Sequence, residues 1–311
     1  MQSSINKIAV VGTGVIGTGW IIRFLFNKKQ IKIFDPSEKQ KRFLLDELKR
    51  TAPLLKKFYK SNININNQLE FCSSIKAAVS DVDLIQENTP ENMIIKKKII
   101  KEISKWSKTN SIIASSSSGL LPSKIQQSCK YPERFLIAHP FNPVYLLPLV
   151  EIVKGLKTKK KFIQNSKLFY KSIGMYPLEL KKEVEGYLSD RLQESMWRES
   201  LHMLNENLAS TDDLDKSIVY GPGMRWALMG TFLTFHLAGG RSGMKHMLEQ
   251  FGPTLKLPWT KLKAPNLTKK LSNKIIIGTK KQSKNKSIRE LTKIRDNFLV
   301  DLLKLKNKYK I

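Results

Sequence analysis

The chain has 311 residues, enough for one large domain or two ordinary ones, and 41% of them are apolar, so it can bury a sizeable core. No run of about 18 apolar residues is present, which excludes a membrane-spanning helix. The formal net charge of +29 is typical of proteins that bind nucleic acids or membrane surfaces, but lysines such as those at 96, 97, 98 and 101 have helical surface spacing, and no nucleic-acid-binding motif accompanies them. We therefore interpret the charge as solvated lysine faces and expect neither a nucleic acid nor a membrane as partner.

Two features bear on the cellular location. The short apolar run at residues 8–11 ends in glycines, so we expect no signal peptide. The two cysteines, Cys72 and Cys129, have neither the spacing of a disulfide framework nor that of a metal site. We expect reduced thiols, no bound metal and a cytoplasmic protein.

The first part of the chain alternates short β-rich runs with helical patterns. The β-rich runs are residues 7–11, 31–34, 69–71, 82–86, 111–114 and 135–138, and the helical patterns are residues 14–27, 37–59 and 91–106. Residues 147–153 and 177–180 add two late strands with a helix between them. This alternation predicts an α/β fold with a mostly parallel sheet and helices on both faces.

The pattern changes near residue 185. A long amphipathic segment at residues 187–207 has apolar side chains at helical spacing, and further helical segments follow, ending with residues 288–309. We therefore predict two domains, an α/β domain at residues 1–184 and an all-helical domain at residues 185–311.

A glycine motif of the form G-x-G-x-x-G follows the first strand and opens the first helix. Gly12 permits a tight turn, Gly14 lets a pyrophosphate approach the backbone, and Gly17 allows close packing of helix and strand. The helix N-terminus then faces the phosphates with its N–H groups and its dipole. Asp35 closes the next β-run, where a carboxylate accepts hydrogen bonds from the adenosine ribose and repels a 2′-phosphate. The motif predicts a Rossmann-type domain that binds NAD rather than NADP.

A second informative block lies between residues 112 and 153. His139 follows a predicted strand, at the sheet edge where such folds bind ligands. Oxidation of an alcohol needs a base for the hydroxyl proton, and a neutral imidazole suits that task near pH 7. Glu151, on the next β-run, could orient the imidazole, and a serine of the run 115–118 could hold the substrate oxygen. Taken alone, a histidine after a strand such as His139 is more often structural, and the serine run could be a simple loop.

These blocks resemble the 3-hydroxyacyl-CoA dehydrogenase superfamily. The resemblance implies an NAD-dependent dehydrogenase whose catalytic set falls on Ser118, His139 and Glu151, the histidine standing in His-Pro-Phe-Asn-Pro. A family motif after the fourth strand, which lies near the nicotinamide ribose, falls on Glu87. Members are commonly homodimers through the helical domain, so the resemblance also implies a homodimer.

Further blocks, chiefly beyond residue 185, resemble the branch of this superfamily that oxidises L-carnitine. Two of them are Tyr-Gly-Pro-Gly-Met-Arg-Trp at 220–226 and Pro-Trp-Thr-Lys-Leu at 258–262. The acyl-CoA enzymes usually open the long helix with Gly-Phe-x-x-Asn-Arg, whereas this chain has Gly-Tyr-Leu-Ser-Asp-Arg at 186–191. Asp190 replaces an asparagine, and because an aspartate cannot donate an amide N–H, the change fits a different and cationic substrate head.

The branch implies a substrate with a trimethylammonium group, which proteins hold with aromatic faces and carboxylates. Trp197, Tyr220 and Trp226 are our candidates for an aromatic wall, and Arg225 or Arg198 for the substrate carboxylate. Alternatives are an L-gulonate 3-dehydrogenase, a 3-hydroxybutyryl-CoA dehydrogenase, or a non-catalytic NAD-binding protein such as a lens crystallin of this superfamily.

Overall fold

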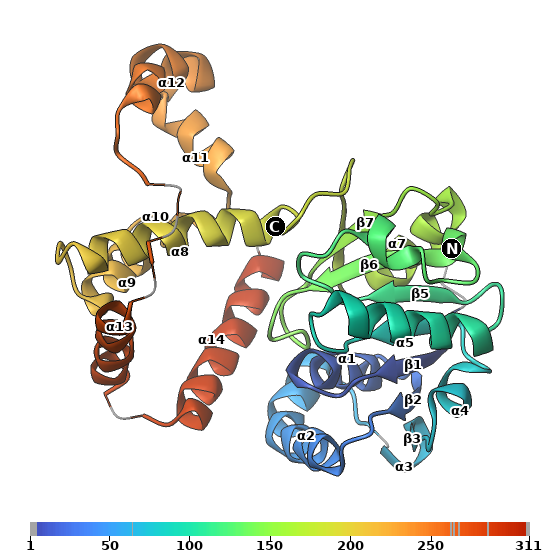
Figure 1. Ribbon diagram of the computed structural model, residues 1–311. Coiled ribbons are helices and arrows are strands. Elements are labelled where there is room, and N and C mark those ends of the chain that lie inside the picture. Colours follow the sequence, from blue (N-terminus) through green and yellow to red (C-terminus); the bar gives the residue numbers. More distant parts are fainter. Residues whose placement is uncertain are drawn as a thin grey trace. The chain divides into compact units, whose positions relative to one another are not determined.

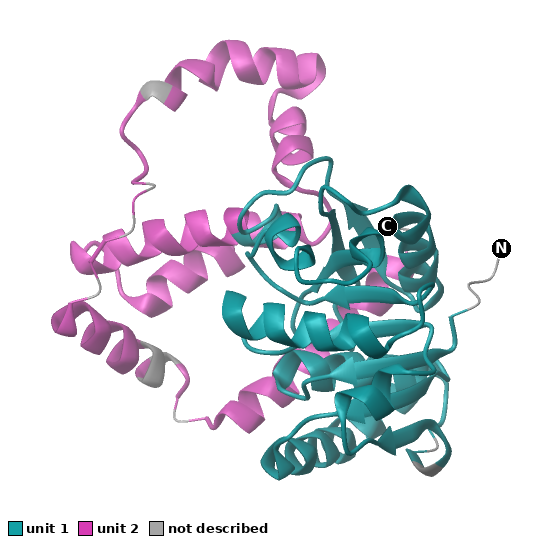
Figure 2. Ribbon diagram, turned by 45° about the vertical axis from the view of Figure 1, so that its right-hand side comes forward, with its two compact units in different colours: residues 1–190 teal, residues 191–311 magenta. Residues whose placement is uncertain are grey.

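The computed structural model describes residues 5–63, 65–261, 263, 265–266, 268–284 and 286–308. The chain divides into two compact units, residues 1–190 and residues 191–311, which Figure 2 shows in teal and magenta.

Unit 1 is built on one eight-stranded sheet. The strands are β1 (Lys7–Val11), β2 (Gln30–Phe34), β3 (Leu69–Phe71), β4 (Leu84–Glu87), β5 (Ile112–Ser115), β6 (Phe135–Pro140), β7 (Leu149–Lys154) and β8 (Tyr176–Glu179). Their order across the sheet is β3-β2-β1-β4-β5-β6-β7-β8. All neighbouring pairs are parallel except β6 and β7, which run antiparallel. The strand order reverses between β1 and β4, and in such sheets ligands bind at the carboxyl ends of the strands near that point.

Helices cover both faces of this sheet (Figure 1). On one face, α1 (Val15–Phe26) packs against α2 (Glu38–Tyr59), and its aromatic side chains contact those of α7 (Lys160–Ser172). On the other face, α4 (Ile75–Val79), α5 (Met93–Trp106) and α6 (Pro122–Gln126) bury their apolar side chains against alternate residues of the strands. A short helix α3 (Ile65–Gln68) precedes β3. Strands that are buried on both faces have nearly continuous apolar sequences, and for this reason they could be predicted from the sequence.

Unit 2 is helical. It contains most of α8 (Ser189–Asn205), followed by α9 (Thr211–Val219), α10 (Pro222–Trp226), α11 (Thr231–Ala238), α12 (Gly243–Phe251), α13 (Lys269–Gln282) and α14 (Ile288–Lys308). Within this unit α9 packs against α10 and α13, and α11 against α12. Of the buried side chains, Leu271 and Val300 are almost completely covered.

The predicted fold class, a Rossmann-type mostly parallel sheet followed by a helical part, is confirmed. Predicted boundaries differ from the observed ones by a few residues, as for the strand expected at 82–86, which spans Leu84–Glu87. Residue 309, the expected end of the last helix, lies outside the described residues. Within the described residues, every helix is either too short or too polar to cross a membrane. The predicted domain boundary at 184/185 stays a prediction.

Candidate active site

The glycine turn between β1 and α1 has the geometry that a dinucleotide requires. Gly12 has a φ of +89°, and a Cβ there would lie 2.8 Å from the backbone oxygen of Asn88. A Cβ on Gly17 would lie 2.0 Å from the oxygen of Gly12. Around Gly14, in contrast, an added Cβ meets nothing within 4 Å. Gly12 and Gly17 are therefore needed for the turn itself, while Gly14 leaves open space at the helix N-terminus for a phosphate group.

Asp35 directly follows β2 and is fixed to the glycine turn. Its Oδ2 accepts hydrogen bonds from the backbone N–H of Thr13 (2.7 Å) and from the Thr13 hydroxyl (3.0 Å), and its Oδ1 accepts from the N–H of Ser37 (2.9 Å). The carboxylate thus stands at the carboxyl edge of the sheet beside the glycine turn. This placement fits an NAD ribose and opposes the extra phosphate of NADP.

Glu87, the other predicted cofactor residue, ends β4 opposite Val11 of β1 and is fully buried. The ammonium of Lys96, itself buried, lies 3.1 and 3.2 Å from its two carboxylate oxygens. The N–H of Thr89 donates to the same carboxylate at 2.6 Å, and the Ser115 hydroxyl donates as well. Because groups of Lys96, Thr89 and Ser115 already engage this carboxylate, the structure gives it a role in fixing the end of β4. Its contact with the nicotinamide ribose stays a prediction.

His139 and Glu151 face each other across β6 and β7. They are direct partners in this antiparallel pair, so their side chains leave the sheet on the same face. His139 Nδ1 lies 2.9 Å from Glu151 Oε2. An ionised carboxylate only accepts hydrogen bonds, so Nδ1 must carry a proton, and in the neutral imidazole the lone pair then lies on Nε2.

Glu151 is fully buried, and its second oxygen is also bound. Oε1 accepts from the N–H of Leu188 (3.1 Å), the N–H of Ser189 (3.0 Å) and the Ser189 hydroxyl (3.1 Å). Burial acts to raise the pKa of Glu151, but the hydrogen bonds from His139 and from these residues outweigh it, and the pKa lies below its usual value. The carboxylate therefore stays ionised and stabilises an imidazolium at His139.

The serine run lies beside His139 because β5 and β6 are parallel neighbours, with Ser115 opposite Ile137. Glu91 holds this loop: its Oε1 accepts from the Ser117 hydroxyl (2.5 Å) and from the N–H groups of Ser118 (3.1 Å) and Gly119 (3.2 Å). Ser118, the predicted catalytic serine, lies on this loop and is exposed to solvent, and its catalytic role stays a prediction.

Tyr187 connects the serine loop to the histidine. Its ring lies 5.5 Å from that of His139, centroid to centroid, and its hydroxyl donates to the backbone oxygen of Leu120 (2.9 Å). Burial raises the pKa of this phenol, which keeps it a neutral donor. The same segment packs against the loop through Gly186, whose backbone nitrogen would lie 3.6 Å from a Cβ on Gly119.

A buried polar network lies beneath the serine loop. The Ser116 hydroxyl accepts from Trp20 Nε1 and Gln86 Nε2, both at 2.9 Å, and donates to Asn88 Oδ1 at 2.8 Å. The Tyr170 hydroxyl donates to Gln86 Oε1 at 2.7 Å. This network joins the cofactor helix α1 to the ends of β4 and β5 and to α7, so the cofactor side and the serine side of the site are fixed to each other.

The structure therefore brings together His139, Glu151 and Asp190, whose Oδ2 lies 3.6 Å from His139 Nε2. The remaining predicted substrate residues lie in unit 2: Trp197 and Arg198 on α8, Tyr220 after α9, and Arg225 and Trp226 on α10. Their roles stay predictions. Sequence reasoning did not identify Glu91, Tyr187 or Ser189, although the last two stand in the same 186–191 motif that contains Asp190. The prediction that Lys96 lies on a solvated face is wrong: its side chain is buried, because its ammonium pairs with the buried Glu87.

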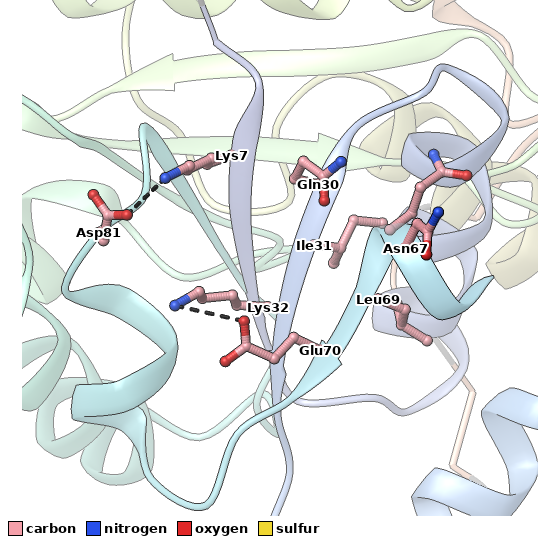
Figure 3. A pocket seen from close by; sticks show the side chains of 9 residues that line it. Lys7, Gln30, Ile31, Lys32, Asn67, Leu69, Glu70 and Asp81 are labelled. Carbon is pink, nitrogen blue, oxygen red and sulfur yellow. Dashed lines mark hydrogen bonds and ion pairs between the residues drawn. The ribbon is translucent and has the colours of Figure 1, made fainter. Parts of the chain in front are cut away.

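A separate cavity of about 560 Å³ opens at the amino ends of β1, β2 and β3, the edge opposite to His139 (Figure 3). Two ion pairs line it, Lys7 with Asp81 (2.7 Å) and Lys32 with Glu70 (3.6 Å). Because these charges neutralise each other and lie far from the glycine turn along the strands, the carboxyl edge is the better candidate for chemistry.

In unit 1 the glycine turn and the His139–Glu151 pair lie at the same, carboxyl, edge of the sheet, an arrangement typical of NAD-dependent dehydrogenases. The chain belongs to the 3-hydroxyacyl-CoA dehydrogenase family: residues 7–184 match its NAD binding domain and residues 186–285 its C-terminal domain. It is accordingly an NAD-dependent oxidoreductase of the kind that oxidises a 3-hydroxyl group.

Its similarity to individual proteins extends over nearly the whole chain. It is 49% identical over 308 residues to an L-carnitine dehydrogenase of Bacillus cereus, which covers 99% of this chain and 94% of that protein. Identity to the L-carnitine dehydrogenase of Oceanobacillus iheyensis is 47% over 304 residues, covering 98% and 99%. A crystal structure of a 5-formyl-3-hydroxy-2-methylpyridine 4-carboxylic acid 5-dehydrogenase shares the fold, with a TM-score of 0.80 over 97% of this chain and 98% of that one, at 23% identity.

Proposed function

We propose that this protein oxidises the 3-hydroxyl of L-carnitine to the ketone of 3-dehydrocarnitine, with NAD as the oxidant and His139 as the general base. The choice of L-carnitine as the substrate rests on the 49% identity to an L-carnitine dehydrogenase over 99% of the chain. The base is supported by the His139–Glu151 pair at the carboxyl edge of the sheet.

In this mechanism Nε2 of His139 takes the proton of the substrate hydroxyl. The ionised Glu151 holds the imidazole through Nδ1 and stabilises the positive charge that forms, and such a charge-assisted hydrogen bond contributes about 1.5–3 kcal/mol. Ser118, on the neighbouring loop, donates a hydrogen bond to the same substrate oxygen. The substrate oxygen is thereby held within reach of Nε2 of His139, both as the alcohol and as the alkoxide that develops during the reaction.

The glycine turn and Asp35 would hold the cofactor, with Glu87 at the end of β4. Gly14 would leave room for the pyrophosphate at the N-terminus of α1, and Asp35, fixed beside the turn by Thr13, would accept from the adenosine ribose. Bound NAD supplies the acceptor for the hydride that leaves the substrate's carbon 3. The polar network around Ser116 fixes the positions of the cofactor helix α1 and the serine loop relative to each other.

Aromatic side chains are proposed to contribute to binding of the trimethylammonium group. Trp197 and Tyr220 are 50% and 77% exposed and Trp226 is 36% exposed, so their faces are available to a trimethylammonium group. Arg225, with Arg198 as its alternative, is proposed to bind the carboxylate. We propose residues 1–184 as the NAD-binding domain and residues 185–311 as the substrate and dimerisation domain.

A cytoplasmic homodimer is also proposed. Large apolar side chains of the helical part stand exposed, for example Phe232 and Leu255, each 84% exposed, and a second copy would cover such surfaces. The two cysteines are free, as expected for a reducing compartment. Light scattering on the purified protein would test the dimer, and a monomeric mass at micromolar concentration would contradict it.

The function is tested by NADH formation at 340 nm with purified protein, NAD and one substrate at a time: L-carnitine, D-carnitine, L-gulonate or 3-hydroxybutyryl-CoA. We expect turnover with L-carnitine alone. Activity with L-gulonate or 3-hydroxybutyryl-CoA but not with L-carnitine would overturn the proposed substrate and leave the base assignment in place. No activity with any of them, while NADH still binds, would support a non-catalytic NAD-binding protein.

A further inference from the structure

The imidazole of His139 stands between two carboxylates that differ in their access to solvent. On the Nδ1 side, Glu151 is fully buried and both of its oxygens are engaged by protein groups. On the Nε2 side, Asp190 Oδ2 lies 3.6 Å away, beyond hydrogen-bonding distance, and its side chain is 31% exposed. A carboxylate with access to solvent therefore stands beside the atom that must face the substrate hydroxyl.

We propose that Asp190 is the specificity-determining counter-ion for the quaternary ammonium of the substrate. This inference rests on the proposed function, because it takes L-carnitine as the substrate. It assigns to Asp190 the charge recognition that Glu151 cannot provide, since Glu151 is closed off by His139, Leu188 and Ser189.

The covalent structure of the substrate supports this assignment. In L-carnitine a single methylene joins the carbon that bears the hydroxyl to the quaternary nitrogen. When the hydroxyl contacts His139 Nε2, the ammonium must therefore lie close to the same nitrogen. A carboxylate within about 4–6 Å of a positive charge stabilises it. Because Asp190 Oδ2 lies 3.6 Å from Nε2, this carboxylate stands beside the nitrogen around which both the hydroxyl and the ammonium must bind.

The chemistry of the trimethylammonium group explains why a carboxylate is a suitable partner for it. A trimethylammonium group has no N–H and cannot form the charge-assisted hydrogen bonds that a lysine or arginine forms, so its recognition depends on a nearby negative charge and on aromatic faces. The substrate carboxylate carries the same sign as Asp190 and is repelled by it. Asp190 therefore also sets the orientation in which the substrate binds, with the ammonium toward Asp190 and the carboxylate away from it.

The test compares L-carnitine with its uncharged isostere, 3-hydroxy-5,5-dimethylhexanoate, in which carbon replaces the quaternary nitrogen. The ratio of kcat/KM for the two substrates isolates the ammonium, because any effect of a mutation on His139 itself acts on both. For the wild-type enzyme we expect a ratio of at least about 10 in favour of L-carnitine. For Asp190→Asn we expect that ratio to fall toward one, mainly through a higher KM for L-carnitine.

The control is Glu70→Gln, which removes an equally charged, 61% exposed carboxylate from the opposite edge of the sheet and should leave the ratio unchanged. Asp190→Ser serves as a second variant, and NADH binding verifies that each variant is folded. An unchanged ratio in both Asp190 variants would overturn the inference while the carnitine activity stands. A wild-type enzyme that does not oxidise L-carnitine overturns the proposed function, and this inference with it.

Discussion

Nδ1 of His139 lies 2.9 Å from Oε2 of Glu151, and the two residues are direct partners on the antiparallel strands β6 and β7. This pair depends on the single antiparallel neighbour relationship in the sheet. Because β7 returns alongside β6, a carboxylate twelve residues further along the chain is brought onto the same face as the histidine. The hydrogen bonds from Leu188 and Ser189 then fix the carboxylate from the other side.

The pair predicts how stability depends on pH. The pKa of Glu151 is lower in the folded protein than in the unfolded chain, so its ionised form stabilises the fold at pH values above about 4.3, the ordinary pKa of a glutamate. That contribution is lost as the pH falls through the folded-state pKa. We expect Glu151→Gln to lower the Tm at pH 7 and to differ less from the wild type as the pH is reduced below about 4. Thermal unfolding from pH 7 to pH 3 measures this, and a constant difference in Tm across the range would contradict it.

The glycine turn predicts opposite behaviour for two neighbouring glycines. A Cβ at Gly17 would lie 2.0 Å from a backbone oxygen, whereas at Gly14 it would meet nothing within 4 Å. We expect Gly17→Ala to destabilise the protein by at least about 1–3 kcal/mol, the usual cost of overpacking. Gly14→Ala should keep a Tm near that of the wild type and bind NADH at least about tenfold more weakly, because its methyl group occupies the space for the pyrophosphate. Thermal unfolding and NADH fluorescence titration separate the two effects, and normal NADH binding by Gly14→Ala would argue against the cofactor site.

The buried ion pair between Lys96 and Glu87 predicts a non-additive pair of mutations. Lys96→Met removes the cation and leaves the Glu87 carboxylate buried among hydrogen-bond donors alone, which costs about 3–5 kcal/mol. Combining it with Glu87→Gln removes the buried charge as well and should recover most of that loss. Urea unfolding of the two single variants and the double variant gives the coupling free energy. Additive losses would show that the pair is not energetically coupled.

The sequence predicted the fold class, the family and the cofactor correctly, because each rests on local patterns. The glycine motif is contiguous, and buried parallel strands are apolar throughout, so neither needs knowledge of distant contacts. Glu91 could not be recognised in the same way. Its importance comes from hydrogen bonds to residues 26 to 28 positions further on, which only the folding of β4 beside β5 brings near. Tyr187 likewise reaches Leu120 across 67 positions.

Asp35 and Glu87 illustrate the same difference within the cofactor site. Asp35 was predicted from its distance to the glycine motif, and the structure places it against Thr13 of that motif. Glu87 was predicted from the resemblance to a family motif after the fourth strand, and that motif does not indicate that Lys96, Thr89 and Ser115 surround its carboxylate. Patterns of residue type locate a side chain along the chain; its hydrogen-bond partners depend on the tertiary fold.

The most direct test of the account is the turnover of His139→Gln with saturating NAD and L-carnitine, measured beside NADH binding by the same preparation. Glutamine keeps a polar side chain of similar reach but cannot accept the hydroxyl proton at neutral pH. We predict a fall in kcat of about 10²–10⁴-fold, the range that a positioned general base contributes, with NADH affinity unchanged within about twofold. Turnover within a few-fold of the wild type would contradict the account and would show that another group removes the proton.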